Sequence, residues 1–135
     1  MIEEINKIIE QYNKYSSSMN VGQLLDIQDK LACSSYYLAE ITGKATEDYN
    51  GYHFNRKVFA NRKKNNLVKA KTPVSKAEIE VFEDEEVLAL WKEERKKEGE
   101  AFKCDLLLKQ INKILSSMQQ RISHLKQEQQ ITKTL

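Results

Sequence analysis

Apolar residues recur at helical spacing in three parts of the chain. Residues 2–19 carry them at steps of three and four, at Ile2, Ile5, Ile9 and Tyr12. Residues 23–71 repeat them every seven positions, at Leu24, Leu31, Leu38, Ala45, Tyr52 and Phe59. Residues 76–130 end in alternating steps of four and three, at Ile111, Leu115, Met118, Ile122 and Leu125. These repeats predict an all-α fold in which two long helices pack together like a coiled coil.

The places where the patterns stop predict the connections between the helices. Pro73 is the only proline of the chain and disfavours helix at the residue before it, so we expect a turn at 71–75. Ser75 and Glu78 match a capping box, in which each side chain bonds the backbone of the other. The third helix is therefore predicted to begin near Lys76 and to continue without a break.

Together these signals predict a helical hairpin over 23–130, with a short N-terminal helix within 1–20 and a tail at 131–135 that frays. Gly43 and Gly51 weaken the second helix locally, at a cost of roughly 1 kcal/mol each. The seven-residue repeat keeps its phase across both glycines, which favours one continuous helix over a break.

An antiparallel hairpin that turns near residue 74 pairs positions whose numbers add to about 148. Leu31 then lies near Met118, and the N-terminal helix covers the end near Leu24 and Leu125. We expect one seam of side chains to join the helices or their copies in an oligomer. Its predicted members are Leu24, Leu31, Leu38, Tyr52, Phe59, Leu90, Leu108, Ile111, Leu115, Met118, Ile122 and Leu125.

Charge is segregated along the chain, although 22 Lys and Arg nearly balance 20 Asp and Glu. Residues 49–77 hold eight basic and no acidic side chains, whereas residues 78–100 hold four basic and ten acidic ones. The hairpin lays these two blocks side by side, so they either neutralise each other or serve partners of opposite charge. Exposed pairs of this kind contribute only about 0–1 kcal/mol each.

Few residues in the sequence suggest catalysis, a cofactor or a metal. Cys33 and Cys104 lie in helical stripes, so we expect two reduced cysteines in the core of an intracellular protein. His53 and His124 show no metal-ligand spacing, and the acidic run 83–86 reads as a solvated helix face. Without a phosphate-binding loop or a membrane-spanning run, a non-enzymatic protein without cofactor or membrane is expected.

The basic arm, residues 53–71, is the strongest candidate for a binding site. Basic side chains interleaved with aromatics can hold a nucleic-acid backbone and stack on bases. The predicted contacts are Arg56, Lys57, Arg62, Lys63, Lys64, Lys69 and Lys71. The hairpin end near Pro73 also carries more aromatic residues than one seam needs, which predicts a homo-oligomer or a partner helix.

Four segments resemble small uncharacterised helical proteins of tailed bacteriophages and prophages. They read LLDIQDKL at 24–31, YYLAE at 36–40, NRK at 55–57 and MQQRISHLK at 118–126, and the resemblance covers about residues 22–128. It implies a protein of the host cytoplasm, often encoded among replication and recombination functions, and carries no catalytic residue. The leading expectation is a non-enzymatic helical assembly or adaptor protein that acts through oligomerisation and binds another copy of itself or a host or phage protein. The alternatives are a nucleic-acid-binding accessory, an inhibitor of a host defence system or a virion component.

Overall fold

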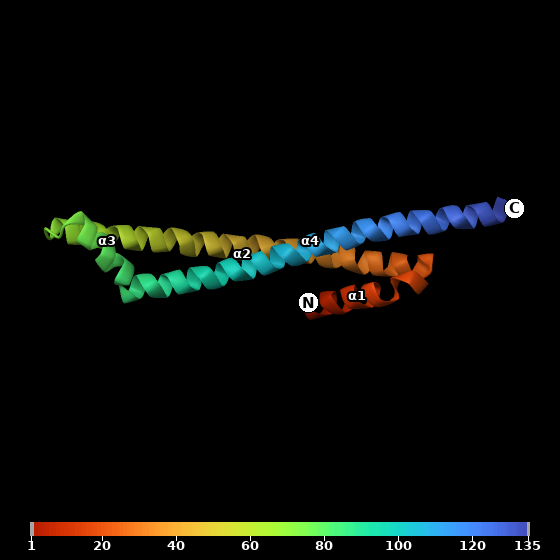
Figure 1. Ribbon diagram of the computed structural model, residues 1–135, viewed down its shortest axis with the longest axis horizontal. Coiled ribbons are helices and arrows are strands. Elements are labelled where there is room, and N and C mark those ends of the chain that lie inside the picture. The colour runs from red at the N-terminus through yellow and green to blue at the C-terminus, as the bar shows by residue number, and fades with distance from the viewer. Residues whose placement is uncertain (1, 135) are drawn as a thin grey trace. The chain divides into compact units, whose positions relative to one another are not determined.

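The computed structural model describes residues 2–134, which are almost entirely helical and contain no strand (Figure 1). The helices are α1 (Ile2–Tyr15), a 3-10 turn (Ser16–Ser18), α2 (Val21–Lys69), α3 (Val74–Glu83) and α4 (Glu85–Thr134). The long helices α2 and α4 run antiparallel and pack against each other, which confirms the predicted all-α hairpin with a short N-terminal helix. Met1 and Leu135, the outermost residues of the predicted N-terminal segment and tail, lie outside the described residues.

The chain divides into two compact units, and both long helices contribute to each. Unit 1 combines residues 2–41 with residues 104–134, and unit 2 is the continuous stretch 42–103. Gly43 and Gly51 lie inside α2 without interrupting it, as the phase of the repeat predicts. At the other end of the chain, α4 continues to Thr134, past residue 130 where the apolar pattern stops.

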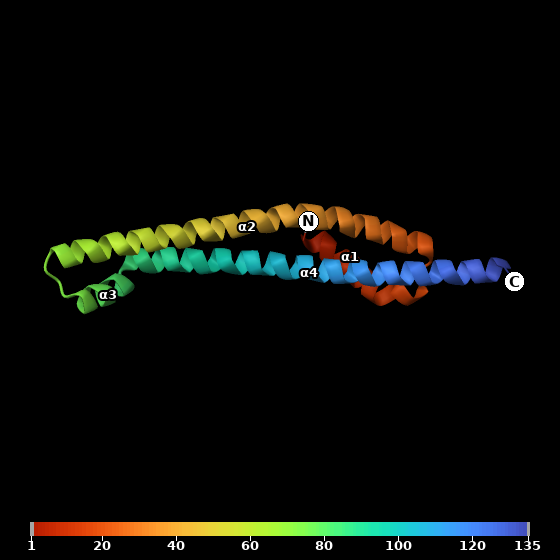
Figure 2. The same cartoon turned by 90° about the horizontal axis from the view of Figure 1, so that it is seen from above.

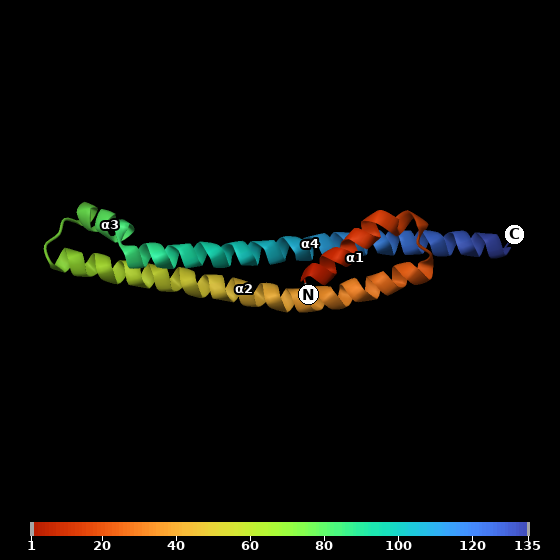
Figure 3. The same ribbon diagram turned by 90° about the horizontal axis from the view of Figure 1, so that it is seen from below.

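Unit 1 is a three-helix bundle in which α1 packs across the first half of α2 and the second half of α4 (Figure 3). Its core draws on all three helices, with Ile5, Ile9, Tyr12, Leu24, Ile27, Leu31, Leu38, Ile111, Ile114, Met118 and Ile122 among the buried members. The side-chain amide of Gln28 donates to Gln119 Oε1 at 2.9 Å. The predicted register pairs Gln28 with residue 120, so the observed pairing is one residue away.

The first residues of α2 are fixed by a reciprocal cap. Asn20 Oδ1 accepts a hydrogen bond from the Gln23 backbone at 2.8 Å, and Gln23 Oε1 accepts one from the Asn20 backbone at 3.0 Å. This is a capping box with Asn in place of Ser or Thr. It starts the helix at Val21, two residues before the predicted position, because Val21 and Gly22 belong to its first turn.

Unit 2 contains the turn of the hairpin, with α3 beside it (Figure 2). The end of α2 is a Schellman motif: the Thr72 amide donates to Leu67 O, and the Lys71 amide donates to Val68 O, each at 3.0 Å. Lys71 takes the left-handed conformation that this motif requires, with φ at 67°. Pro73 then begins the next helix, as N-cap of α3.

Two predictions about this region are wrong. Ser75 does not cap a helix, because α3 already starts at Val74 and its N-cap makes no side-chain hydrogen bond. The third helix is not continuous either, since the chain is extended at Asp84 and α4 begins at Glu85. Asp84 Oδ1 accepts hydrogen bonds from the backbone amides of Glu86 and Val87, at 2.9 and 3.1 Å, and so caps α4.

Candidate interaction surfaces of unit 2

A buried carboxylate lies at the centre of unit 2. Glu94 is 1% exposed and projects from α4 toward α2. One of its oxygens accepts a hydrogen bond from His53 Nδ1, and the other accepts one from Arg56 Nε. Arg56 Nη2 also approaches Glu94 Oε1 at 3.4 Å. Glu94, His53 and Arg56 therefore form one ionic cluster across the two helices.

The cluster keeps Glu94 ionised. Burial by itself would raise the pKa of Glu94, because removal from water disfavours the charged form. The hydrogen bonds and charges of Arg56 and His53 outweigh burial and hold the pKa of Glu94 below its ordinary value near 4.5. A buried charge of this kind is tolerated only while its partners stay in place.

Two further ion pairs link the basic and acidic blocks of unit 2. Lys63 Nζ lies 2.5 Å from Asp84 Oδ2, and Lys64 Nζ lies 2.9 Å from Glu78 Oε1. The hydrogen bond between Lys63 and Asp84 raises the pKa of the lysine and lowers that of the carboxyl group, which the Val87 amide lowers further. Acidic side chains of α3 and α4 thus engage part of the basic arm.

The seven basic residues of the predicted nucleic-acid site separate into two groups. Arg56, Lys63 and Lys64 are half-buried and form the ion pairs described above, with acidic residues of the opposing segment. The other four are exposed and form no ion pair with any residue in 2–134: Lys57, Arg62, Lys69 and Lys71. The arm is therefore neutralised along the helix seam and remains charged elsewhere.

The apolar core of unit 2 is small. Among its residues only Ala77, Val81 and Val87 are buried apolar side chains, and Glu94 is the other buried residue. Large apolar side chains remain in contact with solvent on the same unit: Phe54, Val68, Val74, Ile79, Phe82, Leu88, Trp91 and Phe102. Two packed helices of this length bury too little apolar surface to cover them all.

Some of these exposed side chains surround a hollow of about 180 Å³. Phe82 comes from α3, Val87, Leu88 and Trp91 come from the first turns of α4, and Arg56 adds its side chain from α2. Phe82 is 76% exposed and Trp91 is 43% exposed. Arg95, one turn after Trp91, holds its guanidinium 5.4 Å from the centre of the indole ring. Phe102 lies eleven residues, or about three turns, beyond Trp91 and so on the same face of α4.

The predicted seam residues all lie at least half-buried. Leu24, Leu31, Leu38, Ile111, Met118 and Ile122 are buried, while Tyr52, Phe59, Leu90, Leu108, Leu115 and Leu125 are half-buried. In unit 1 these positions belong to the bundle core or pack against it. The seam residues of unit 1 thus pack against other residues of the same chain.

Three expectations about reactive side chains need correction. Cys33 is exposed rather than in the core, because it lies two residues, about 200° of helix rotation, from the buried Leu31. His124 does have an acidic neighbour one turn away, since its Nε2 lies 3.1 Å from Glu128 Oε1 on the surface. The acidic run 83–86 interrupts the helix at Asp84 instead of forming one solvated face.

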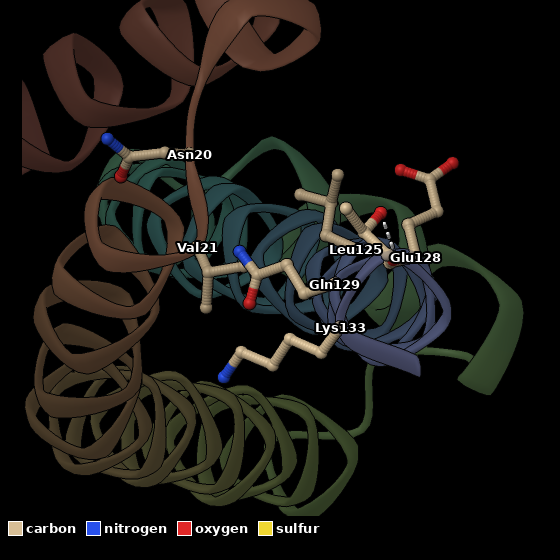
Figure 4. Close-up of a pocket in the computed structure, with 7 residues that line it drawn as sticks. Asn20, Val21, Leu125, Glu128, Gln129 and Lys133 are labelled. Carbon is tan, nitrogen blue, oxygen red and sulfur yellow. Dashed lines mark hydrogen bonds between the residues drawn. The ribbon is translucent and has the colours of Figure 1, made fainter. Parts of the chain in front are cut away.

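No three His, Cys, Asp or Glu side chains of the described chain gather in a way that could hold a metal ion. A hollow of about 510 Å³ in unit 1 lies beside the last turns of α4 (Figure 4). Asn20 and Val21 line it at the start of α2, and Leu125 and Gln129 line it from α4; most of its exposed lining is apolar. The buried ionic cluster and the hollow beside Phe82 and Trp91 both belong to unit 2.

No family of known proteins, no curated protein and no solved structure matches the chain. In residues 2–134 there is also no helix with a stretch long and apolar enough to cross a membrane.

Proposed function

We propose that the chain is a non-enzymatic helical assembly protein that associates with a second copy of itself. The association uses the apolar patch, which we define as Phe82, Leu88, Trp91 and Phe102 of unit 2. The observation that supports it is the imbalance within this unit, where three buried apolar side chains accompany a larger number of exposed ones. Association would remove the exposed ones from water, which is the main favourable term in most protein association.

The composition of the apolar patch favours a protein partner. Trp and Arg are enriched among the residues that dominate binding energy at protein interfaces, particularly in pockets that exclude water, and Phe is enriched in interface cores. The hollow between Phe82, Leu88 and Trp91 is of a size that accepts one large side chain. Arg56 is among the residues that line the hollow, and the guanidinium of Arg95 lies over the ring of Trp91.

The charges around the apolar patch favour a second copy as that partner. Arg95 Nη1 lies 2.5 Å from Glu98 Oε2, so these two charges, one turn after Trp91 and one turn before Phe102, balance each other. Two identical surfaces related by a two-fold axis can then meet without like-charge repulsion. A partner of strong charge of either sign would gain nothing from this arrangement.

Sedimentation velocity over a concentration series tests the proposal. The expected result is a dimer, accompanied by a blue shift of the emission of Trp91, the only tryptophan of the chain. A chain that stays monomeric up to about 100 µM, a concentration that would populate even a weak dimer, would exclude self-association as its function.

The variant Phe82→Glu should abolish the dimer without unfolding the protein, because Phe82 is 76% exposed. Burying that ring removes on the order of 150 Å² from water and contributes about 3–4 kcal/mol, so its loss weakens association at least about 100-fold. Tyr36→Glu is the matched control, since Tyr36 is 67% exposed but belongs to unit 1. Equal weakening by both variants would place the interface elsewhere.

A further inference from the structure

The last turns of α2 alternate between half-buried and exposed pairs of residues. Phe59 and Ala60, Lys63 and Lys64, and then Leu67 are half-buried. The residues between them are exposed, and of these Asn66 lines a hollow with Glu80 and Asp84 on the packed side. The other three, together with Lys69 in the next turn, form what we call the basic face: Asn61, Arg62, Asn65 and Lys69.

The positive charge of the basic face is not cancelled by any neighbouring acid. No Asp or Glu occurs between residues 49 and 77, and neither Arg62 nor Lys69 forms an ion pair with a residue in 2–134. Two exposed cations of α4 are paired within their own helix: Arg95 with Glu98, and Lys109 with Asp105 at 2.9 Å. The acids of α3 and α4 that meet α2 instead engage Arg56, Lys63 and Lys64.

We propose that the basic face binds the phosphate backbone of nucleic acid. Arg and Lys supply positive charge, and the Asn side chains supply amide donors, which are the groups that proteins direct at phosphate oxygens. The basic face contains no aromatic residue that could stack on a base, so the contact is with the backbone and is independent of sequence. A duplex carries one charge per roughly 1.7 Å of its axis, so several phosphates lie within the roughly 10 Å of helix that separates Arg62 from Lys69.

The number of contacts sets the expected affinity. Arg62 and Lys69 provide two, and the exposed Lys57 and Lys71 at either end raise the number to four at most. The slope of log affinity against log salt should therefore lie between about −1.8 and −3.6 for duplex DNA. With four contacts the same relation gives a Kd on the order of 10⁻⁵ M at about 50 mM salt.

The decisive experiment is fluorescence anisotropy with a labelled DNA duplex and the corresponding single strand over a salt series, with the full chain. The test variant is Arg62→Glu plus Lys69→Glu. The control is Lys113→Glu plus Lys126→Glu, two exposed lysines of unit 1 that form no ion pair with a residue in 2–134, so the total charge changes equally. Each lost phosphate contact should lower the affinity for DNA about 15-fold at about 50 mM salt. The test variant should therefore bind roughly 200-fold more weakly than the parent, and the control should bind nearly as well as the parent.

Three outcomes would overturn the proposal. One is no binding to either nucleic acid at low salt, and another is equal loss of affinity in the test and control variants. The third is binding to vesicles that contain phosphatidylserine without binding to DNA, which would assign the basic face to an anionic membrane surface. Circular dichroism of both variants verifies that a loss of binding does not come from a loss of helix.

Discussion

The buried carboxylate of unit 2 allows a quantitative test by the substitution Glu94→Gln. The amide nearly keeps the shape of the side chain but loses its charge. Its oxygen can still accept a hydrogen bond from His53 or from Arg56, but its nitrogen, itself a donor, then takes the place of the oxygen that the other residue bonds. Charge-assisted hydrogen bonds contribute about 1.5–3 kcal/mol and neutral ones about 1 kcal/mol. Arg56 is 23% exposed and can turn toward water. We therefore expect the free energy of unfolding of unit 2 to fall by about 2 kcal/mol. This is less than the roughly 3–5 kcal/mol found when a fully buried ion pair is broken.

The measurement is urea unfolding followed by the fluorescence of Trp91, which lies one turn before Glu94 and reports on unit 2. Glu93→Gln is the matched control, because it makes the same chemical change at an exposed neighbouring position. Glu93→Gln should change the free energy of unfolding by no more than about 0.5 kcal/mol. Equal midpoints for the two variants would refute the ionic role given to Glu94.

The pH dependence gives a second, independent check. Because the folded pKa of Glu94 is lowered, ionisation of Glu94 stabilises the fold above the ordinary value near 4.5. That stability is lost as the pH falls through the folded pKa, where the parent carboxyl group becomes neutral like the amide. The difference between parent and Glu94→Gln should therefore shrink below pH 4.5, and a difference that persists undiminished at still lower pH would contradict the assignment.

Two backbone predictions concern α2. Lys71→Gly should raise the thermal midpoint, since a left-handed conformation costs an L-residue about 1 kcal/mol that glycine avoids, and no gain in thermal unfolding would contradict the Schellman geometry. Gly51→Ala should stabilise the protein by up to about 1 kcal/mol, because an added Cβ meets no atom within 4 Å and alanine favours helix. A loss of stability in chemical denaturation would show that the open side of Gly51 is covered by another molecule.

The main helices could be predicted because apolar periodicity encodes them directly. The seven-residue repeat indicated a continuous α2, and one proline located the turn. Observed pairs such as His53 with Glu94 and Lys63 with Asp84 lie one residue from the predicted register. The packing of apolar side chains between the helices determines this register, and the spacing of those side chains can be read from the sequence.

The polar details of unit 2 were harder to predict because they depend on which charged group meets which. Asp84 followed by two glutamates is a typical start of a helix, but within an acidic run it was interpreted as solvated surface. Glu94 lies at a seam position, and the predicted register already set it between His53 and Arg56 of the opposing helix. That juxtaposition was the available signal, since a charged residue on a seam needs an identifiable partner.

The cluster of Glu94, His53 and Arg56 also has a consequence for errors in pairing. Helices with a seven-residue repeat can slide by one repeat and still match apolar residues. A slide in one direction would set Glu94 opposite Thr46 and Tyr49, neither of which can neutralise it. A slide in the other direction would set Arg56 against Ala101 but would bring Glu94 opposite Ala60 and Lys63, where the carboxylate finds a new cation. The hairpin shifted in the first direction, and each copy exchanged between chains in that frame, would carry an uncompensated charge, so the ionic cluster disfavours a structure that the apolar residues alone would accept.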